Sequence, residues 1–126
     1  MKRVVAIRGA VCTENTEEAI TKNVCEMCNK IFSQNHLHEY DLISIIFSVT
    51  KDINILNPAT ALRKGKTVLD ISETPLFCTQ EPDILNSMPC VIRVIIYAYK
   101  YRFSQKHNVY LNGAEKLRPD YENLDC

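Results

Sequence analysis

Two arginines interrupt apolar segments that otherwise have the pattern of β-strands. Arg8 lies in the alternating segment 3–12, and Arg93 lies in the segment 90–101, which is rich in Val, Ile and Tyr. Burial of an unpaired guanidinium is costly, so each arginine needs a carboxylate, an anionic ligand or water. A single such arginine is best explained by a half-exposed strand face. Two arginines on separate strands, with Glu81 at the end of a third, favour an anion-binding site.

The sequence lacks the motifs of several other kinds of site. It contains no Gly-rich phosphate loop, no G-x-S-x-G or H-E-x-x-H motif and no paired metal carboxylates. Cys25 and Cys28 form a C-x-x-C, but zinc needs a second ligand pair, and the nearest candidates, His36 and His38, fall in a predicted loop. We therefore expect reduced thiols, with Cys28 in a helix core and Cys25 at its edge, and neither a metal nor a cofactor.

Composition limits the possible partners and the location. The chain has 126 residues, and its 15 basic side chains balance 15 acidic ones, whereas nucleic-acid binders usually have a basic excess. The longest apolar stretch, residues 90–99, contains Arg93 and is too short to cross a bilayer. Residues 1–8 lack the apolar region of a signal peptide. We expect a cytoplasmic protein that binds neither nucleic acid nor membrane.

Periodicity predicts one α+β domain over residues 1–126. The spacing predicts helices at 16–33 and from Asn57-Pro58 to Gly65. The polar residues 13–16 are expected to supply capping oxygens for the first helix, with Asn15 followed three residues later by Glu18. The predicted strands are residues 3–12, 42–50, 67–70, 75–80, 90–101 and 109–111, followed by an irregular tail at about 112–126. In the segment 42–50, the apolar face is predicted to be Ile43, Ile45, Phe47 and Val49. This order indicates a ferredoxin-like fold, a single mixed β-sheet with helices on one face.

Six blocks of sequence, in order, resemble the small trimeric chorismate mutases. The resemblance covers nearly the whole chain, and each polar residue that looked out of place in a strand falls in one of the blocks. The blocks are residues 7–10 (IRGA), 57–63 (NPATALR), 78–81 (CTQE), 88–94 (MPCVIRV), 107–111 (HNVYL) and 117–120 (LRPD).

The resemblance implies an assembly and a reaction. Members of this family form homotrimers that look like an α/β-barrel, with active sites at the subunit interfaces. They isomerise chorismate to prephenate, a step of the shikimate pathway towards the aromatic amino acids. This [3,3] rearrangement needs no nucleophile, general base, metal or cofactor. It needs the flexible dianionic substrate to be held in a compact chair, which is a positioning task.

The resemblance also implies roles for individual residues. Arg93 would donate to the ether oxygen, where negative charge grows, and Glu81 would bind the ring hydroxyl and face the developing positive charge. Arg8 and Tyr110 would bind the side-chain carboxylate, and Cys78 would line the hydroxyl site mainly through its backbone. The remaining predicted substrate-binding residues line the site or its entrance: Phe77, Thr79, Gln80, Arg63, Asn57, Ala59, Thr60, Leu117 and Arg118.

Two positions depart from the family pattern. Asn57 stands where the family usually has phenylalanine, and Thr60 stands where a charged residue is common.

Three other functions remain open. One alternative is a trimeric sensor that binds a chorismate-like carboxylate with little or no turnover. Another is a related trimeric fold that deaminates small imines. The third is a ferredoxin-like interaction module without a ligand, in which the arginines would be solvated or paired with structural carboxylates.

Overall fold

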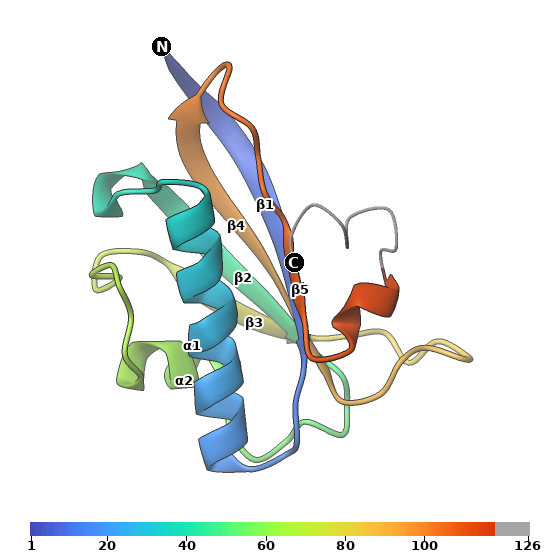
Figure 1. The fold of residues 1–126 in the computed structure, drawn as a ribbon. Helices are drawn as coiled ribbons and strands as arrows, with labels where there is room; N and C mark the ends of the chain where they lie inside the picture. Colours follow the sequence, from blue (N-terminus) through green and yellow to red (C-terminus); the bar gives the residue numbers. More distant parts are fainter. Residues whose placement is uncertain (118–126) are drawn as a thin grey trace.

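The computed structural model describes residues 1–117 as a five-stranded sheet with two α-helices on one face (Figure 1). The strands are β1 (Lys2–Cys12), β2 (Leu42–Val49), β3 (Leu76–Gln80), β4 (Val91–Tyr101) and β5 (Val109–Leu111), in the order β3-β2-β4-β1-β5. β4 is antiparallel to β1 and β2, whereas β3 is parallel to β2 and β5 is parallel to β1. This mixed sheet confirms the predicted α+β class.

The helices begin and end close to the predicted positions. They are α1 (Glu17–Gln34) and α2 (Pro58–Lys64), with single turns of 3-10 helix at η1 (Glu39–Asp41) and η2 (Ala114–Leu117). Thr16 caps α1, since its hydroxyl accepts from the Ala19 backbone N–H at 3.1 Å. Thr16 is one of the residues 13–16 that were predicted to supply the cap, whereas the side-chain oxygen of Asn15 accepts from the backbone N–H groups of Asn54 and Ile55.

The strand predicted at residues 67–70 is absent, and that prediction is wrong. This segment is a series of bends tied to α1 by Asn29, whose amide donates to the Lys66 carbonyl and accepts from the Val68 N–H. Thr67 also donates to the Leu69 carbonyl at 2.7 Å. Side-chain hydrogen bonds therefore satisfy the backbone groups that a strand would have paired with a neighbour.

A register shift near the start of β2 changes which residue faces the helices. Leu42 pairs with Ala98, while Ser44 already pairs with Tyr97, so a bulge separates the two. Ile45, Phe47 and Val49 pack towards the core as predicted, but Leu42 takes the place expected for Ile43. Strict alternation failed here because the extra residue reverses the facing of everything before it.

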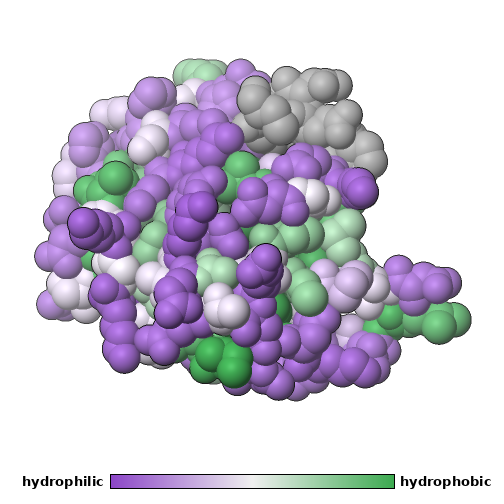
Figure 2. All heavy atoms as spheres, turned by 60° about the horizontal axis from the view of Figure 1, so that its bottom comes forward, coloured by the Kyte–Doolittle hydropathy of each residue, from purple (hydrophilic) through white to green (hydrophobic). Residues whose placement is uncertain are grey.

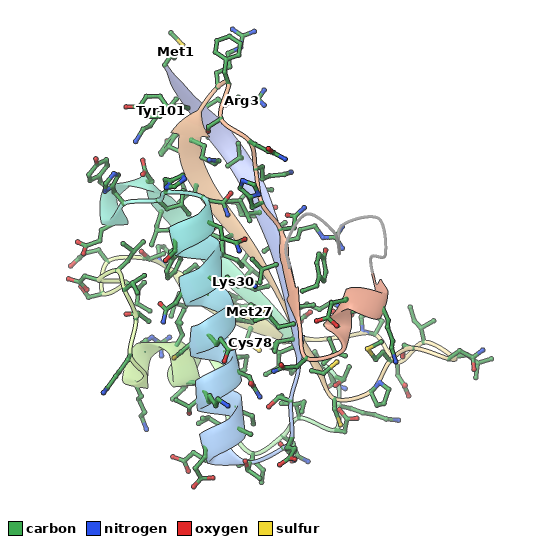
Figure 3. All side chains as sticks on the ribbon, viewed as in Figure 1. Met1, Arg3, Met27, Lys30, Cys78 and Tyr101 are labelled. Carbon is green, nitrogen blue, oxygen red and sulfur yellow. The ribbon has the colours of Figure 1, made fainter. Side chains whose placement is uncertain are left out.

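The core lies between the sheet and the two helices. It includes Met27 of α1 and the side chain of Cys78, which packs against it from β3 (Figure 3). Gly9 allows the closest approach, because a β-carbon there would lie 2.9 Å from Ile31 Cδ1 and 3.1 Å from the Val109 carbonyl oxygen. The residue after Arg8 thus lets α1 and β5 pack directly against β1.

The other face of the sheet is largely uncovered within the described residues. A small cluster covers part of it, in which Ala114 of η2 packs with Ala10, Val91 and Tyr110, and Met88 packs against them. The segment between β3 and β4 projects from this side of the molecule (Figure 1), and its tip carries the exposed side chains of Ile84 and Leu85. The hydrophobic end of this projection stands out from an otherwise mostly hydrophilic surface (Figure 2).

Candidate active site

A pocket of about 310 Å³ opens on the face of the sheet that the helices do not cover. This volume lies at the lower end of the roughly 300–1,000 Å³ typical of small-molecule sites. The pocket collects residues from four strands, from the end of β3 and from η2. Its lining residues are Arg8, Gly9, Ala10, Ile46, Phe47, Ser48, Thr79, Glu81, Arg93, Val94, Ile95, Tyr110 and Leu117.

Strand register brings the polar residues of the pocket together. Ala10 pairs with Arg93 on one side and with Tyr110 on the other. Ser48 pairs with Arg93 and, across its other edge, with Thr79. Directly paired residues point to the same face of a sheet, so these side chains form a row across it.

Glu81 and Arg93 form an ion pair inside the pocket. The Arg93 Nε lies 3.4 Å from Glu81 Oε1, and the two side chains are 38% and 21% exposed. The Glu81 backbone N–H donates to the Val49 carbonyl at 2.7 Å, which extends the β2–β3 pairing by one residue and holds Glu81 beside the pocket. The same carboxylate oxygen, Oε1, accepts a hydrogen bond from the Ser48 hydroxyl.

The Arg93 guanidinium retains capacity for a ligand. Its Nε is buried and makes no hydrogen bond with any described group. The 3.4 Å contact with Glu81 Oε1 is an ion pair without hydrogen-bond geometry. A guanidinium carries five N–H donors in a fixed planar fork, which matches the geometry of carboxylate and phosphate groups. Among the described lining residues, the charged groups are Arg8, Arg93 and Glu81. The pocket therefore has a net positive charge, which favours an anionic ligand.

Tyr110 and the residues beside it close the other end of the pocket. Tyr110 is only 3% exposed and packs with Ala10, Val91 and Ala114, while Leu117 lies against this group. Asn108, just before β5, accepts from the backbone N–H of Arg8 at 2.8 Å. These contacts connect the end of the described chain to the strand that carries Arg8.

The structure therefore brings together six of the predicted site residues. They are Arg8, Thr79, Glu81, Arg93, Tyr110 and Leu117. Arg118 lies outside the described residues. The side chain of Cys78 packs against the core on the opposite face of the sheet, and burial raises the pKa of its thiol. Phe77 and Gln80 are exposed on β3 and do not line the pocket.

The four predicted residues at and on α2 lie away from this pocket. The Asn57 side chain accepts from the Ala59 backbone N–H at 2.8 Å and so caps α2. Ala59 is buried in the core, Thr60 is half-buried and Arg63 is exposed. Because α2 packs on the helical face of the sheet, these side chains do not reach the Arg93 pocket of the same chain.

Ser48 is a site residue that the sequence analysis missed. Alternation puts it opposite the predicted apolar face of the segment 42–50, but the sequence analysis gave it no role. A small hydroxyl flanked by apolar residues in a strand is a weak signal, because serine is common on solvated strand faces. Its partner Glu81 is 33 positions away, so only the pairing of β2 with β3 and β4 joins them.

The cysteines have the surroundings of packed thiols. Cys28 is fully buried in the helix core, as predicted. Cys25, which was predicted at the edge of the core, is also buried in it, and its thiol lies 3.8 Å from the Ala61 carbonyl. Desolvation raises the pKa of both thiols. Among residues 1–117, no cluster of three or more His, Cys, Asp or Glu side chains is arranged to hold a metal ion. None of the described helices is both long and apolar enough to cross a membrane.

Comparison with known proteins gives consistent matches. The family model for type I chorismate mutases matches residues 4–121. The chorismate mutase AroH of Thermus thermophilus is 34% identical over 123 residues, which cover 95% of this chain and 98% of the relative. The chorismate mutase AroH of Bacillus subtilis is 32% identical over 116 residues, which cover 90% of this chain and 89% of the relative.

A solved structure matches as well. A chorismate mutase from Clostridium thermocellum is 35% identical and superposes with a TM-score of 0.76 over 89% of this chain and 98% of the other. The similarity therefore extends over most of the sequence and over the fold that forms the Arg93 pocket.

Proposed function

The chain belongs to the type I chorismate mutase family, and we propose that it isomerises chorismate to prephenate in the Arg93 pocket by positioning and electrostatic stabilisation alone. The observation that carries the site assignment is the Arg93–Glu81 pair, an opposed cation and anion inside an open pocket with net positive charge. A rearrangement without a nucleophile or general base needs fixed charges of this kind.

Substrate binding follows from the charges around the pocket. The substrate is a dianion, and the arginines on β1 and β4 supply two positive charges against the single negative charge of Glu81. Arg8 and Tyr110 lie on adjacent strands and would hold the side-chain carboxylate. Two anchored ends restrict the substrate to the compact chair from which the new carbon–carbon bond forms, a gain in effective concentration rather than in chemical reactivity.

Transition-state stabilisation would come from the ion pair itself. As the ether bond breaks, negative charge develops on the departing oxygen, where Arg93 would donate a charge-assisted hydrogen bond. Positive charge develops on the ring, which Glu81 would face while accepting from the ring hydroxyl. The Ser48 hydrogen bond to Glu81 holds that carboxylate in place before the substrate arrives, so little reorganisation is needed at the moment of reaction.

The active protein is proposed to be a homotrimer with its sites between subunits, forming a barrel-like assembly. Two observations support this arrangement. The uncovered face of the sheet exposes large apolar side chains, among them Val4, Phe77 and Tyr99. The α2 residues predicted to bind substrate lie far from the Arg93 pocket of their own chain, so Arg63 would reach a substrate only in the site of a neighbouring copy.

The remaining parts of the proposal follow from the reaction. Prephenate formation belongs to aromatic amino-acid biosynthesis, a cytoplasmic pathway, and requires no cofactor or nucleic acid. The competing proposal is a trimeric binding protein that holds a chorismate-like carboxylate with little turnover. It is favoured only by Asn57, whose side chain caps α2 where phenylalanine is usual.

A direct assay separates the two proposals. Purified full-length protein is incubated with chorismate, and the loss of the ultraviolet absorbance of chorismate is followed before and after dialysis against a chelator. We expect saturable turnover that is unchanged by the chelator and by a reducing agent. Saturable binding of chorismate without turnover would support the sensor. Turnover that disappears with the chelator would contradict the mechanism without a cofactor.

A further inference from the structure

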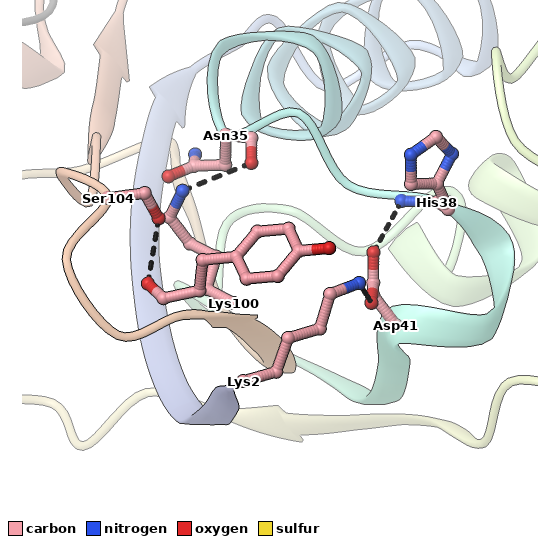
Figure 4. A network of polar contacts seen from close by, with 7 residues as sticks. Lys2, Asn35, His38, Asp41, Lys100 and Ser104 are labelled. Carbon is pink, nitrogen blue, oxygen red and sulfur yellow. Dashed lines mark hydrogen bonds and ion pairs between the residues drawn. The ribbon is translucent and has the colours of Figure 1, made fainter.

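A second cavity lies at the other end of the sheet from the Arg93 pocket. Its volume is about 240 Å³, and it is enclosed by the C-terminal end of α1, by η1 and by the ends of β1 and β4 (Figure 4). The two cavities share no lining residue. Arg93 and Tyr101 both lie on β4, and at about 3.3 Å per residue they are roughly 26 Å apart along the strand.

One carboxylate in this cavity is fully engaged by its neighbours. Lys2 Nζ donates to Asp41 Oδ1 at 2.6 Å, and the backbone N–H of His38 donates to Asp41 Oδ2 at 2.8 Å (Figure 4). Asp41 is nearly completely buried. It therefore pairs directly with Lys2, and no described salt bridge joins it to a second cation.

Lys100 is that second cation. It is only 5% exposed, and its ammonium donates to the Asn35 carbonyl oxygen at 3.2 Å. No salt bridge to Lys100 occurs among the described residues. An ammonium has three N–H donors, so one neutral acceptor leaves it under-satisfied. Desolvation lowers the pKa of Lys100, and the charge of Asp41 opposes that shift.

Aromatic rings form another part of the cavity wall. The Lys2 ammonium lies 5.1 Å from the ring centroid of Tyr40 and 5.0 Å from that of Tyr101. The imidazole of His38 stacks on Tyr40, with centroids 5.2 Å apart and an angle of 9° between the planes. The cavity thus combines an excess of positive charge with flat surfaces on which a ring can stack.

We propose that this cavity is a second ligand site, for a small carboxylate that carries a planar ring. The carboxylate would accept from the Lys100 ammonium and offset its desolvation, and the ring would pack against Tyr40 and Tyr101. Lys2 and Asp41 would remain paired and would orient the tyrosine rings through the Lys2 cation–π contacts. This inference does not depend on the proposed isomerase function, because none of these residues lines the Arg93 pocket.

Benzoate is the probe for this site, because it joins one carboxylate to one ring. The full-length ¹⁵N-labelled protein is titrated with benzoate, with acetate and with benzyl alcohol, and binding is followed by calorimetry and by amide chemical shifts. We expect saturable benzoate binding with the largest shifts at His36, His38 and Tyr101. Acetate lacks the ring and benzyl alcohol lacks the charge, so each should bind about tenfold more weakly or worse.

Three variants make the test specific. Lys100→Met keeps most of the length of the side chain but removes its charge, and it should weaken benzoate binding about tenfold or more. Lys51→Met is the matched control, because Lys51 pairs with Asp83 on the surface outside this cavity, and it should bind benzoate as the wild type does. Tyr101→Ala removes an exposed ring and tests the same site if Lys100→Met does not fold.

Other outcomes would overturn the proposal. If Lys100 serves only to cap the carbonyl groups at the end of α1, Lys100→Met lowers the melting temperature and leaves benzoate affinity unchanged. Shifts that cluster at Arg8 and Glu81 would assign the binding to the Arg93 pocket. Shifts that remain linear in concentration would show that no specific site exists.

Discussion

The Arg93 guanidinium contacts Glu81 through Nε at 3.4 Å, in a geometry that does not satisfy that atom as a hydrogen-bond donor. Such a group can respond to charge that appears during the reaction, because its donors are not saturated in the resting state. At the scale of the residue, this separates Arg93 from Arg63, which is exposed on α2. The two arginines are therefore expected to respond differently to substitution.

Replacement of Arg93 by citrulline keeps the shape and removes the charge. If Arg93 stabilises charge that exists only in the transition state, kcat should fall more than KM rises. The loss of one preorganised donor typically costs ~10²–10³ in kcat, and the loss of a full charge would cost more. Arg63→Ala should mainly raise KM. Steady-state kinetics and melting temperatures of both variants test this, and a folded citrulline variant with near-normal kcat would contradict the mechanism.

Ser48 positions Glu81, and its removal should affect turnover more than binding. Ser48→Ala deletes the hydrogen bond to Glu81 Oε1, so we expect kcat to fall roughly tenfold, in line with a hydrogen bond to a charged group. Ser48→Thr keeps a hydroxyl and should recover most of the loss. Ser44→Ala is the matched control, because Ser44 lies on the same face of β2 outside the pocket. Equal kinetics for both alanine variants would show that Ser48 has no positioning role.

At the scale of the element, the segment between β3 and β4 depends on Asp52. Its Oδ1 accepts from the Thr50 hydroxyl at 2.5 Å, and both carboxylate oxygens accept from the Cys90 backbone N–H. Cys90 has a positive φ of 57°, which is unfavourable for a residue with a β-carbon. Asp52 thus holds the strained residue that immediately precedes β4, three positions before Arg93.

Asp52→Asn should destabilise the protein at neutral pH by about 1–2 kcal/mol, because an amide oxygen replaces a charged acceptor. The Thr50 hydroxyl, and then the Cys90 N–H, lower the pKa of Asp52 below 3.8. The folded pKa therefore lies below the unfolded one, so the stabilisation is present above about pH 4 and disappears as the pH falls through the folded pKa. Urea unfolding at pH 7 and pH 3 should show a difference between wild type and variant that shrinks in acid.

Asp83→Asn is the control for this experiment. Asp83 lies in the same projecting segment, and its ion pair with Lys51 is exposed on both sides. Exposed pairs of this kind contribute little to stability, so the control should match the wild type at both pH values. A loss at Asp83 as large as that at Asp52 would contradict a specific role for the hydrogen bonds of Asp52.

At the scale of the whole molecule, the uncovered face of the sheet leads to the prediction of a trimer. Light scattering at micromolar concentration should give three times the 14.5 kDa of one chain. Val4, 54% exposed on this face, should tolerate no charge if a second copy covers it, so Val4→Asp should give folded monomers without activity. Val68→Asp is the control, because Val68 is 59% exposed in the bends beside α1. A monomeric wild type with full activity would contradict the shared site.

The periodicity of apolar residues along the chain was sufficient to predict most of the helices and strands. Alternation in β1 and β4 predicted the strands that carry Arg8 and Arg93, because the period of a strand is two residues wherever no bulge intervenes. The structure then shows that both arginines lie on the face opposite the helices. The same rule failed at the start of β2, where a bulge put Leu42 in the core in place of Ile43. It failed again at residues 67–70, where Asn29 of α1 satisfies backbone groups that a strand would have paired.

What only the tertiary structure decided is which distant residues meet. Both β2–β3 and β2–β4 pairing are needed to bring Ser48 to Glu81 and Arg93, and no local pattern records such pairing. The charges of the pocket were readable from the sequence, since arginine is costly to place in an apolar strand without a partner. Their spatial arrangement was not, because it results from strand register, which is set by the packing of the whole sheet against α1 and α2.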